Sequence, residues 1–245
     1  MIVEYGFWTE AWDRFLPEVR RLIAEAEGRR VCELGAGAKP ALALEEVRAA
    51  DLDYVLVDID PGELAKAGDG YTKVVGDVTQ PLDLGAPFDV VVTKTLVEHV
   101  EDPARFHRNV LRLLRPGGRA FHFFPTLYAP PFVLNRFLPE ALAERALRRA
   151  QPGREPEGPS AKFKAYYRWC RGPTRRQIAR FRRLGYEIER YAGFFGQSGY
   201  LERVQSLKEL DERVARFLVR HPQPSFTSYA HVVLVKPVEP AQPVK

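Results

Sequence analysis

The sequence lacks the features that mark secreted and membrane-spanning proteins. Only two cysteines occur in 245 residues, Cys32 and Cys170, and they lie far apart. No apolar run approaches the length of a membrane span, and the first residues lack the charged and apolar regions of a signal peptide. Because Cys32 falls in an expected buried strand, no structural disulfide is expected, and we expect a cytoplasmic protein.

Length and composition allow a globular core, and the charge is unevenly distributed. Apolar residues make up 45% of the chain and charged residues 28%, which suits one α/β domain with an insertion or a small cap. Residues 141–185 hold 13 Lys and Arg but only 3 Asp and Glu, whereas the rest of the chain is net acidic. This basic segment needs its own explanation.

Strand and helix patterns alternate through the first half of the chain. Such alternation predicts an α/β fold with a doubly wound, mostly parallel, Rossmann-like sheet. Two later strands, at residues 185–191 and 230–235, bring the expected sheet to seven strands. The earlier strands are expected at residues 30–34, 54–57, 73–75, 88–93 and 119–124, with helices at 39–50 and 102–114.

The pattern divides the chain into five regions. Aromatic residues at the N-terminus indicate either a helix packed on the sheet or a lid over a ligand. After the sheet core, dense aromatic and basic residues predict a helical cap that binds an acceptor. The regions are an N-terminal helix or lid at 1–27, a cofactor-binding core at 28–126, the cap at 127–184, the C-terminal part of the sheet at 185–236 and a flexible tail at 237–245.

A glycine-containing turn follows the first strand of this core. Gly35 and Gly37 permit a sharp turn and a close approach to a ligand. A helix from residue 39 would offer unpaired N–H groups beside that turn. Glu33, two residues before the first glycine, suits one of two tasks: it faces a cationic ligand group or it orders the turn. The turn predicts a nucleotide-type binding site.

Acidic residues end three successive strands of the expected sheet, namely Glu33, Asp58 and Asp77. The carboxyl ends of parallel strands meet at one edge, where ligands bind. Asp58 follows Gly37 by 21 positions, near the spacing at which an acidic residue binds a ribose diol. Asp77 is placed to accept from an adenine amino group. Any one of these residues is more often a turn or a helix cap, but the set predicts a nucleoside site.

These motifs resemble those of the class I S-adenosylmethionine-dependent methyltransferases. The sequence ELGAG at residues 33–37 is similar to motif I, and VDID at 57–60 is similar to motif II. GDV at 76–78 and FDVVVTK at 88–94 resemble motifs III and IV. LLRPGG at 113–118 resembles the turn before strand five in the branch that includes quinone-biosynthesis methyltransferases. Lys39 departs from the pattern, since many members have a small residue there.

The resemblance implies S-adenosylmethionine as cofactor and a set of contacts to it. A metal is not implied. Lys94 would contact the methionine part mostly through its backbone. The implied cofactor-binding residues are Glu33, Gly35, Ala36 and Gly37 around the methionine part, Asp58 and Ile59 from motif II with Asp58 on the ribose, Asp77 and Val78 at the adenine, and Lys94.

His99 is the candidate catalytic residue, because it follows the fourth strand near the expected methyl position. The near-neutral pKa range of histidine suits a general base. The alternative is a structural histidine at the start of the next helix. Glu98 is a weak metal-ligand candidate with His99, since no third ligand is in reach. His122 is expected in the core or in a pocket wall.

The acceptor is expected to be a small or lipid-like molecule, with O-methylation slightly favoured. The basic segment is explained by a solvated helical face, an anionic acceptor bound by Arg168, Arg171 or Arg175, peripheral membrane contact, or nucleic acid. Nucleic acid is disfavoured because the motifs of base methyltransferases are absent after the fourth strand. The sequence does not predict an oligomeric state.

Two other functions remain open. One is a nonenzymatic adenosylmethionine-binding or RNA-associated protein. The other, less favoured, is an NAD(P)-dependent oxidoreductase on a similar fold. That fingerprint requires a third glycine three residues after the second, and Pro40 stands there.

Overall fold

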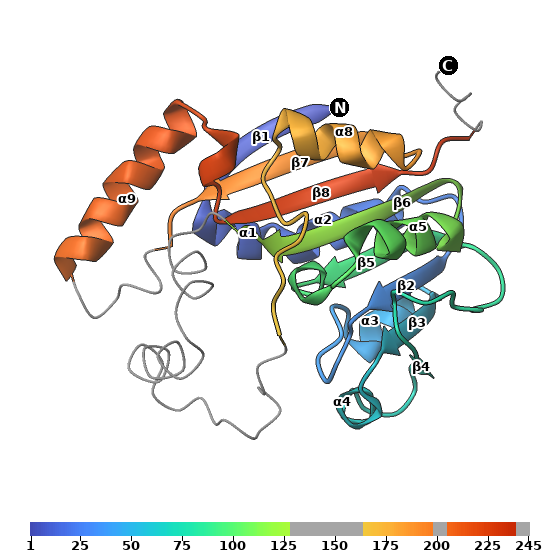
Figure 1. Cartoon of the computed structure of the whole chain (residues 1–245). Coiled ribbons are helices and arrows are strands. Elements are labelled where there is room, and N and C mark those ends of the chain that lie inside the picture. Colours follow the sequence, from blue (N-terminus) through green and yellow to red (C-terminus); the bar gives the residue numbers. More distant parts are fainter. Residues whose placement is uncertain (128–163, 198–204, 239–245) are drawn as a thin grey trace, which may run out of the picture.

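The computed structural model describes residues 1–127, 164–197 and 205–238 (Figure 1). The described residues form one mixed sheet in the order β1-β7-β8-β6-β5-β2-β3-β4. Only β8 runs antiparallel to its neighbours, β6 and β7. The strands are β1 Ile2–Phe7, β2 Arg30–Leu34, β3 Asp53–Asp58, β4 Thr72–Val75, β5 Phe88–Lys94, β6 Leu114–Pro125, β7 Glu187–Phe195 and β8 Tyr229–Val235.

Helices cover both faces of the sheet, which makes a three-layer α/β structure (Figure 1). Polar caps fix several helix starts: Asp60 caps α4, Asp102 caps α5 and Thr174 caps α8. The helices are α1 Trp8–Asp13, α2 Phe15–Ala24, α3 Leu44–Ala49, α4 Pro61–Ala65, α5 Pro103–Leu113, α8 Arg175–Arg183 and α9 Gln205–Arg220, with short 3-10 helices η1 Val97–His99 and η3 Pro224–Phe226.

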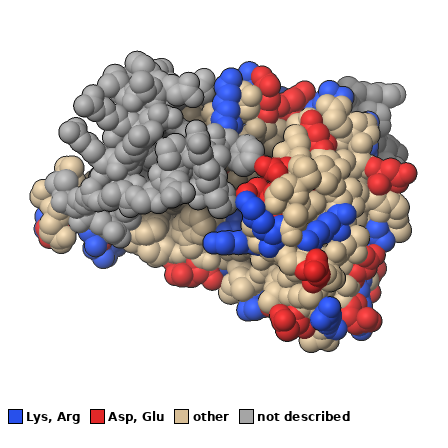
Figure 2. Space-filling view, turned by 90° about the horizontal axis from the view of Figure 1, so that it is seen from below, with Lys and Arg blue, Asp and Glu red and all other residues tan. Residues whose placement is uncertain are grey.

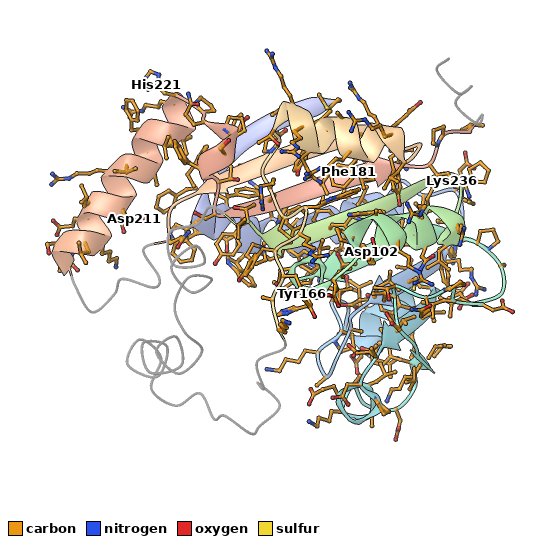
Figure 3. All side chains as sticks on the ribbon, viewed as in Figure 1. Asp102, Tyr166, Phe181, Asp211, His221 and Lys236 are labelled. Carbon is orange, nitrogen blue, oxygen red and sulfur yellow. The ribbon has the colours of Figure 1, made fainter. Side chains whose placement is uncertain are left out.

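Two apolar cores lie on opposite faces of the sheet. One contains Phe106 of α5 and Phe181 of α8, which points from its helix toward the sheet (Figure 3). The other contains Phe15 and Leu22 of α2. β5 is buried from Phe88 through Thr93, as a central strand covered on both faces should be. These cores hold the parallel strands in register, so their carboxyl ends form one edge.

The N-terminal region differs from the predicted helix or lid because it begins with a strand. β1 pairs in parallel with β7, which makes an eighth strand where seven were predicted. The following helices then pack on the sheet: the Trp12 ring meets Phe123 edge-on at 4.8 Å, and Phe15 stacks on Phe121 at 5.5 Å between centroids. The alternatives were a helix packed on the sheet and a lid over a ligand, and these contacts match the packed helix.

Several boundaries also moved. The helix predicted at 39–50 begins only at Leu44, and the strand predicted at 119–124 extends over Leu114–Pro125. Within the predicted cap, α8 packs on the sheet through Phe181. Most of the predicted aromatic cap, residues 128–163, lies outside the described residues.

Two expectations about covalent structure and membranes can be compared with the fold. Cys32 and Cys170 are both buried free thiols, so the expectation of no disulfide is confirmed. Among residues 1–127, 164–197 and 205–238, no helix has the length and apolar character needed to cross a membrane.

Asp89, near the start of β5, links the starts of β2 and β6. Its carboxylate accepts hydrogen bonds from the backbone N–H groups of Gly28 and Arg30, at 3.1 and 2.9 Å, and pairs with the Arg115 guanidinium. The residue is buried, so water cannot replace these partners. Asp89, part of the motif IV resemblance, therefore has a structural role at the edge opposite the glycine turn.

Replacement of Asp89 tests this role. Asp89→Ala leaves two backbone donors and one guanidinium without their acceptor, and we expect a loss of roughly 3 kcal/mol in the free energy of unfolding. Urea denaturation measures it. Asp69→Ala, which removes an exposed carboxylate, should change stability by less than about 0.5 kcal/mol. Equal stability of the two variants would contradict the structural role.

Candidate functional site

The candidate site lies where the strand order reverses. The chain proceeds from β2 outward to β3 and β4, then returns to place β5 on the other side of β2. Ligands of doubly wound sheets bind beyond the carboxyl ends of strands at such a switch point. The turn after β2 and the residues after β5 flank this point, so the geometry brings together the predicted motifs I and IV.

The glycine turn is fastened to the neighbouring strand. Gly35 and Gly37 have φ values of 71° and 52°, in the left-handed region that glycine tolerates. The Gly35 N–H donates to the Val57 carbonyl at 2.8 Å. A Cβ at Gly35 would lie only 2.8 Å from the Leu96 side chain, so a side chain there would force Leu96 to move. A Cβ built on Gly37 would meet only an Asp58 oxygen, at 3.9 Å, which leaves space above the turn.

Asp58 ends β3 beside this turn. One carboxylate oxygen accepts from the Gly37 N–H at 2.8 Å, and the other accepts from the Asp60 N–H at 2.9 Å. These bonds fix the carboxylate, and each oxygen keeps a second lone pair for a ligand donor. The next residue, Ile59, is 60% exposed, so a large apolar side chain stands beside the carboxylate. The pair can bind a molecule with hydroxyl groups and a flat apolar face.

Glu33 is buried behind the turn. Its oxygens accept from the Ala41 N–H at 3.1 and 2.9 Å, and one also accepts from the Tyr54 hydroxyl at 2.7 Å. Burial raises the pKa of Glu33 to about 7, although those two donors and the Lys94 charge act in the opposite direction. Of the two predicted tasks, these contacts match the ordering of the turn. The Ala41 contact also accounts for the late start of α3, because it holds the backbone between the glycine turn and Leu44 outside a helix.

Asp77 sits at the end of β4, as predicted, and forms a turn. One of its oxygens accepts from the N–H and the hydroxyl of Thr79, at 2.8 and 2.7 Å. Gly76 N–H donates to the Asp58 carbonyl, so the two acidic residues belong to adjacent strand ends. The Val78 carbonyl accepts from the Asn109 side chain at 3.1 Å. A contact of Asp77 and Val78 with adenine stays a prediction.

Residues 94–96 flank the site from the β5 side. The Lys94 ammonium lies over the Phe15 and Trp12 rings, 5.2 and 5.7 Å from their centroids. Thr95 has a φ of 50°, which is an outlier for a β-branched residue, and such strain is concentrated at ligand sites. Thr95 and Leu96 were not predicted as site residues. Nothing in a threonine or leucine signals a left-handed backbone or a contact with Gly35.

His99 and Glu98 form a pair just beyond β5, in η1. His99 Nδ1 lies 3.2 Å from the Lys164 carbonyl. A carbonyl only accepts, so Nδ1 carries the proton and Nε2 is the nitrogen able to take one. His99 Nε2 lies 3.9 Å from a Glu98 oxygen. The other oxygen, Glu98 Oε2, is buried with no hydrogen-bond partner among the described residues. Burial raises the pKa of Glu98 to about 8.

The remaining candidates are structural. His122 is fully buried, with Nδ1 2.9 Å from the Thr93 hydroxyl, and burial lowers its pKa to about 3. It is a core residue, one of the two predicted alternatives. Glu98 and His99 gain no third ligand: the described part of the chain contains no cluster of three or more metal-ligating side chains.

The central part of the chain is similar to known proteins. Residues 32–122 match the family model described as "Methyltransferase domain". An uncharacterized methyltransferase from Mycobacterium marinum is 29% identical over 110 residues, which cover 43% of this chain and 42% of that protein. The alignment therefore spans less than half the length of that relative. The comparisons do not single out the quinone-biosynthesis branch.

Solved structures share the fold. An S-adenosylmethionine-dependent methyltransferase from Mesorhizobium loti has a TM-score of 0.51 and 20% identity, covering 89% of this chain and 96% of that one. The cyclase SpnF has a TM-score of 0.57 and 16% identity, covering 96% and 84%. At these identities the likeness shows the fold alone, which confirms the predicted Rossmann-like architecture.

The buried carboxyl of Glu98 generates a pH-dependent prediction. Because its pKa is higher in the folded protein than in the unfolded chain, the folded state binds a proton more tightly from about pH 4.5 to 8. The stability that protonated Glu98 contributes to the folded state is fully present below this window and is lost as pH rises to about 8. Relative to Glu98→Gln, the wild type should lose on the order of 1 kcal/mol per pH unit within it.

Urea unfolding of both proteins between pH 5 and 8.5 measures this difference. Glu45→Gln, at an exposed carboxylate, is the matched control and should run parallel to the wild type. A difference between wild type and Glu98→Gln that is flat across this range would show that Glu98 is already ionised in the folded protein.

Proposed function

We propose that this chain, whose residues 32–122 match the methyltransferase domain model, is a class I S-adenosylmethionine-dependent methyltransferase that transfers a methyl group to a small or lipid-like acceptor. The observation that carries the proposal is the glycine turn bound to Asp58 at the switch point of the sheet. S-adenosylmethionine is the cofactor that goes with this domain and fold.

The residues at the sheet edge fit this cofactor. The space above Gly37 admits a ligand close to the backbone. Asp58 would accept from the ribose hydroxyls, with roughly 1.5–3 kcal/mol for each charge-assisted bond. Exposed Ile59 would cover one face of the adenine. Glu33 would act from behind the turn, since its oxygens are engaged by Ala41 and Tyr54.

Methyl transfer depends more on the positioning of acceptor and cofactor than on reactive side chains. Bound S-adenosylmethionine supplies an activated methyl group on a sulfonium that leaves as a neutral thioether. The chain must hold the acceptor atom in line with that methyl, which can contribute on the order of 7–11 kcal/mol. His99, whose Nδ1 lies 3.2 Å from the Lys164 carbonyl, would deprotonate or orient the acceptor through Nε2. A hydroxyl acceptor fits this arrangement, in line with the slight preference for O-methylation.

Two observations weigh against an NAD(P)-dependent oxidoreductase. Dinucleotide sites place a pyrophosphate at the start of the helix that follows the glycine turn. Here α3 begins at Leu44, seven residues after Gly37, and the intervening backbone is bound to Glu33. Pro40 also replaces the third glycine of the fingerprint. A methyl-transfer assay distinguishes the nonenzymatic alternative, because a protein that only binds adenosylmethionine would not transfer its methyl group to an acceptor.

Partners are proposed from the basic segment at residues 141–185, of which residues 164–185 belong to the described part of the chain. Figure 2 shows acidic and basic side chains interspersed over the described part of one face, so no extended basic surface for nucleic acid is seen there. A small anionic or lipid-like acceptor, with peripheral membrane contact through the basic segment, remains the proposal.

Cofactor binding gives the first prediction of this function. Asp58→Ala removes the acceptor for the ribose and should weaken S-adenosylmethionine affinity at least tenfold in calorimetry, with the protein still folded. Asp53→Ala is the matched control, since Asp53 is exposed at the opposite end of the same strand. Unchanged affinity in the Asp58 variant would count against the assignment.

Catalysis gives a second prediction. His99→Ala should lower turnover by roughly 100-fold or more, the range of general-base catalysis, while cofactor affinity changes less. Methyl transfer to a panel of phenols, amines and carboxylates measures turnover, and His221→Ala, a histidine beyond the end of α9, is the control. Intact turnover in the His99 variant would remove its catalytic role.

A further inference from the structure

A row of large apolar side chains is exposed along α9. Residues three or four positions apart share one face of a helix. Four residues, each between 47% and 60% exposed, follow one another at intervals of three, four and three positions: Leu207, Leu210, Val214 and Phe217. Contiguous exposed apolar surface marks an interaction site, whereas single exposed apolar residues do not. We call these four residues the α9 stripe.

Another face of α9 fastens the helix to the end of β7. Ala215 is buried, and a Cβ built on Gly196 would lie only 2.9 Å from the Ala215 Cβ. The Gln197 N–H donates to the Asp211 carboxylate at 2.7 Å. Because β8 runs antiparallel to both β6 and β7, β7 ends at the same edge of the sheet as β6 and β5. α9 therefore lies at the edge where the glycine turn is also found (Figure 1).

Arginines border the α9 stripe on one side. Arg213 follows Leu210 by three positions and Arg220 follows Phe217 by three, so each is a neighbour of the stripe on the helix surface. Both arginines are exposed, and within residues 1–127, 164–197 and 205–238 neither forms an ion pair. An arginine in this position can lay its stem along apolar surface while its charge stays in a polar layer.

The acidic residues of α9 do not cancel this charge at the stripe. Glu209 and Glu212 are not three or four positions from any stripe residue, so they lie off its borders. Glu212 also pairs with Arg216 at 2.9 Å. Asp211 does border the stripe, but its carboxylate is bound at the end of β7. A second copy of α9 would bring the same arginines and repel them, whereas a surface of anionic lipid complements them.

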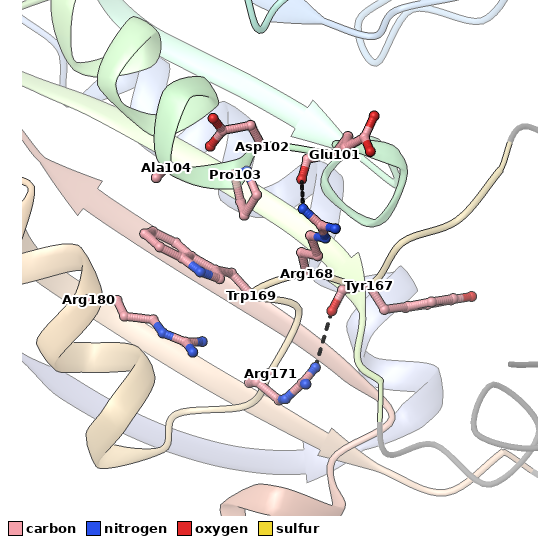
Figure 4. A pocket seen from close by; sticks show the side chains of 9 residues that line it. All are labelled: Glu101, Asp102, Pro103, Ala104, Tyr167, Arg168, Trp169, Arg171 and Arg180. Carbon is pink, nitrogen blue, oxygen red and sulfur yellow. Dashed lines mark hydrogen bonds between the residues drawn. The ribbon is translucent and has the colours of Figure 1, made fainter.

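The basic segment directs part of its charge to the protein itself. Arg168 donates to the Glu101 carbonyl at 3.0 Å, and Arg171 donates to the Tyr167 carbonyl at 3.2 Å (Figure 4). These guanidinium groups are engaged by the backbone. A membrane contact is therefore better placed on α9, where exposed apolar and cationic side chains lie next to one another.

We propose that the α9 stripe docks on a membrane that contains anionic lipids. A helix of this kind lies in the plane of the interface, with its apolar side chains below the headgroups and its arginines among the phosphates. The edge of the sheet that carries α9 then lies beside the bilayer, from which a lipid-like acceptor would enter. The docking surface goes beyond the proposed methyl transfer, and binding to lipid does not depend on it.

Vesicle sedimentation tests the proposal. The full chain is mixed with sucrose-loaded vesicles of phosphatidylcholine alone, or of equal parts phosphatidylcholine and phosphatidylglycerol, without S-adenosylmethionine. We expect partition onto the anionic vesicles to exceed partition onto the neutral ones by about tenfold or more, since basic side chains near the surface gain from its negative potential. Added salt should reduce the difference, because it screens that potential.

Matched variants test the stripe. Phe217→Glu and, independently, Leu210→Glu remove apolar area that the bilayer would bury, and each should weaken partition onto the anionic vesicles by about tenfold or more. Val238→Glu makes the same change at a 77% exposed position beside Gly117, at the opposite edge of the sheet. It should leave partition within about twofold. Circular dichroism should show the wild-type fold for all three variants, because the positions are exposed.

Two double variants separate α9 from the basic segment. Arg213→Gln with Arg220→Gln removes two charges beside the stripe. Arg175→Gln with Arg176→Gln removes the same charge from exposed positions on α8, within the basic segment. We expect the α9 pair to weaken binding to anionic vesicles by about tenfold or more, and the α8 pair to change it by less than about threefold.

Several results would overturn the proposal: no binding to either kind of vesicle, binding unchanged by both stripe variants, or equal losses in the two arginine pairs. A dimer in light scattering that Phe217→Glu dissociates, with no vesicle binding by the wild type, would show that a second copy covers the stripe instead. Because vesicle binding is measured without cofactor or methyl transfer, its failure is distinct from failure of the proposed function.

Discussion

The hydrogen bond from the Gly37 N–H to the Asp58 carboxylate joins the turn after β2 to the end of β3, and the site is built on it. The bond forms only because β2 and β3 pair in parallel with Leu34 opposite Val57. That register is set by the apolar side chains buried on both faces of the sheet. Core packing thus places the Asp58 carboxylate next to the left-handed Gly37, so that one nucleoside could contact both.

Two further carboxyl groups lie behind this edge, and both are buried. Glu33 holds the backbone after the glycine turn, and Glu98 lies next to His99. Burial raises the pKa of each. The acidic groups at this end of the sheet therefore divide into Asp58, which keeps acceptor capacity for a ligand, and buried groups that shape the backbone around it. The Glu98 carbonyl also holds the left-handed backbone at Tyr167, because it accepts from the N–H groups of Tyr166 and Tyr167.

Much of this arrangement was predictable from the sequence, because it depends on local patterns. Apolar strands and the acidic strand ends predicted the central sheet and the position of Asp58. The strand β1 was not predictable, because it forms by pairing with β7 about 190 residues away. The late start of α3 was also missed, since it depends on the contact between Glu33 and the Ala41 N–H. Likewise, no residue type announces the left-handed backbone of Thr95 or Trp169.

The central claim is that the edge formed by the glycine turn and Asp58 binds the adenosyl cofactor. A crystal structure of the protein with S-adenosylhomocysteine tests it most directly. The account predicts both ribose hydroxyls within hydrogen-bonding distance of Asp58, the adenine against Ile59 and the homocysteine part over Gly35 and Gly37. A nucleoside bound elsewhere, with Asp58 making only its bonds to the N–H groups of Gly37 and Asp60, would contradict it.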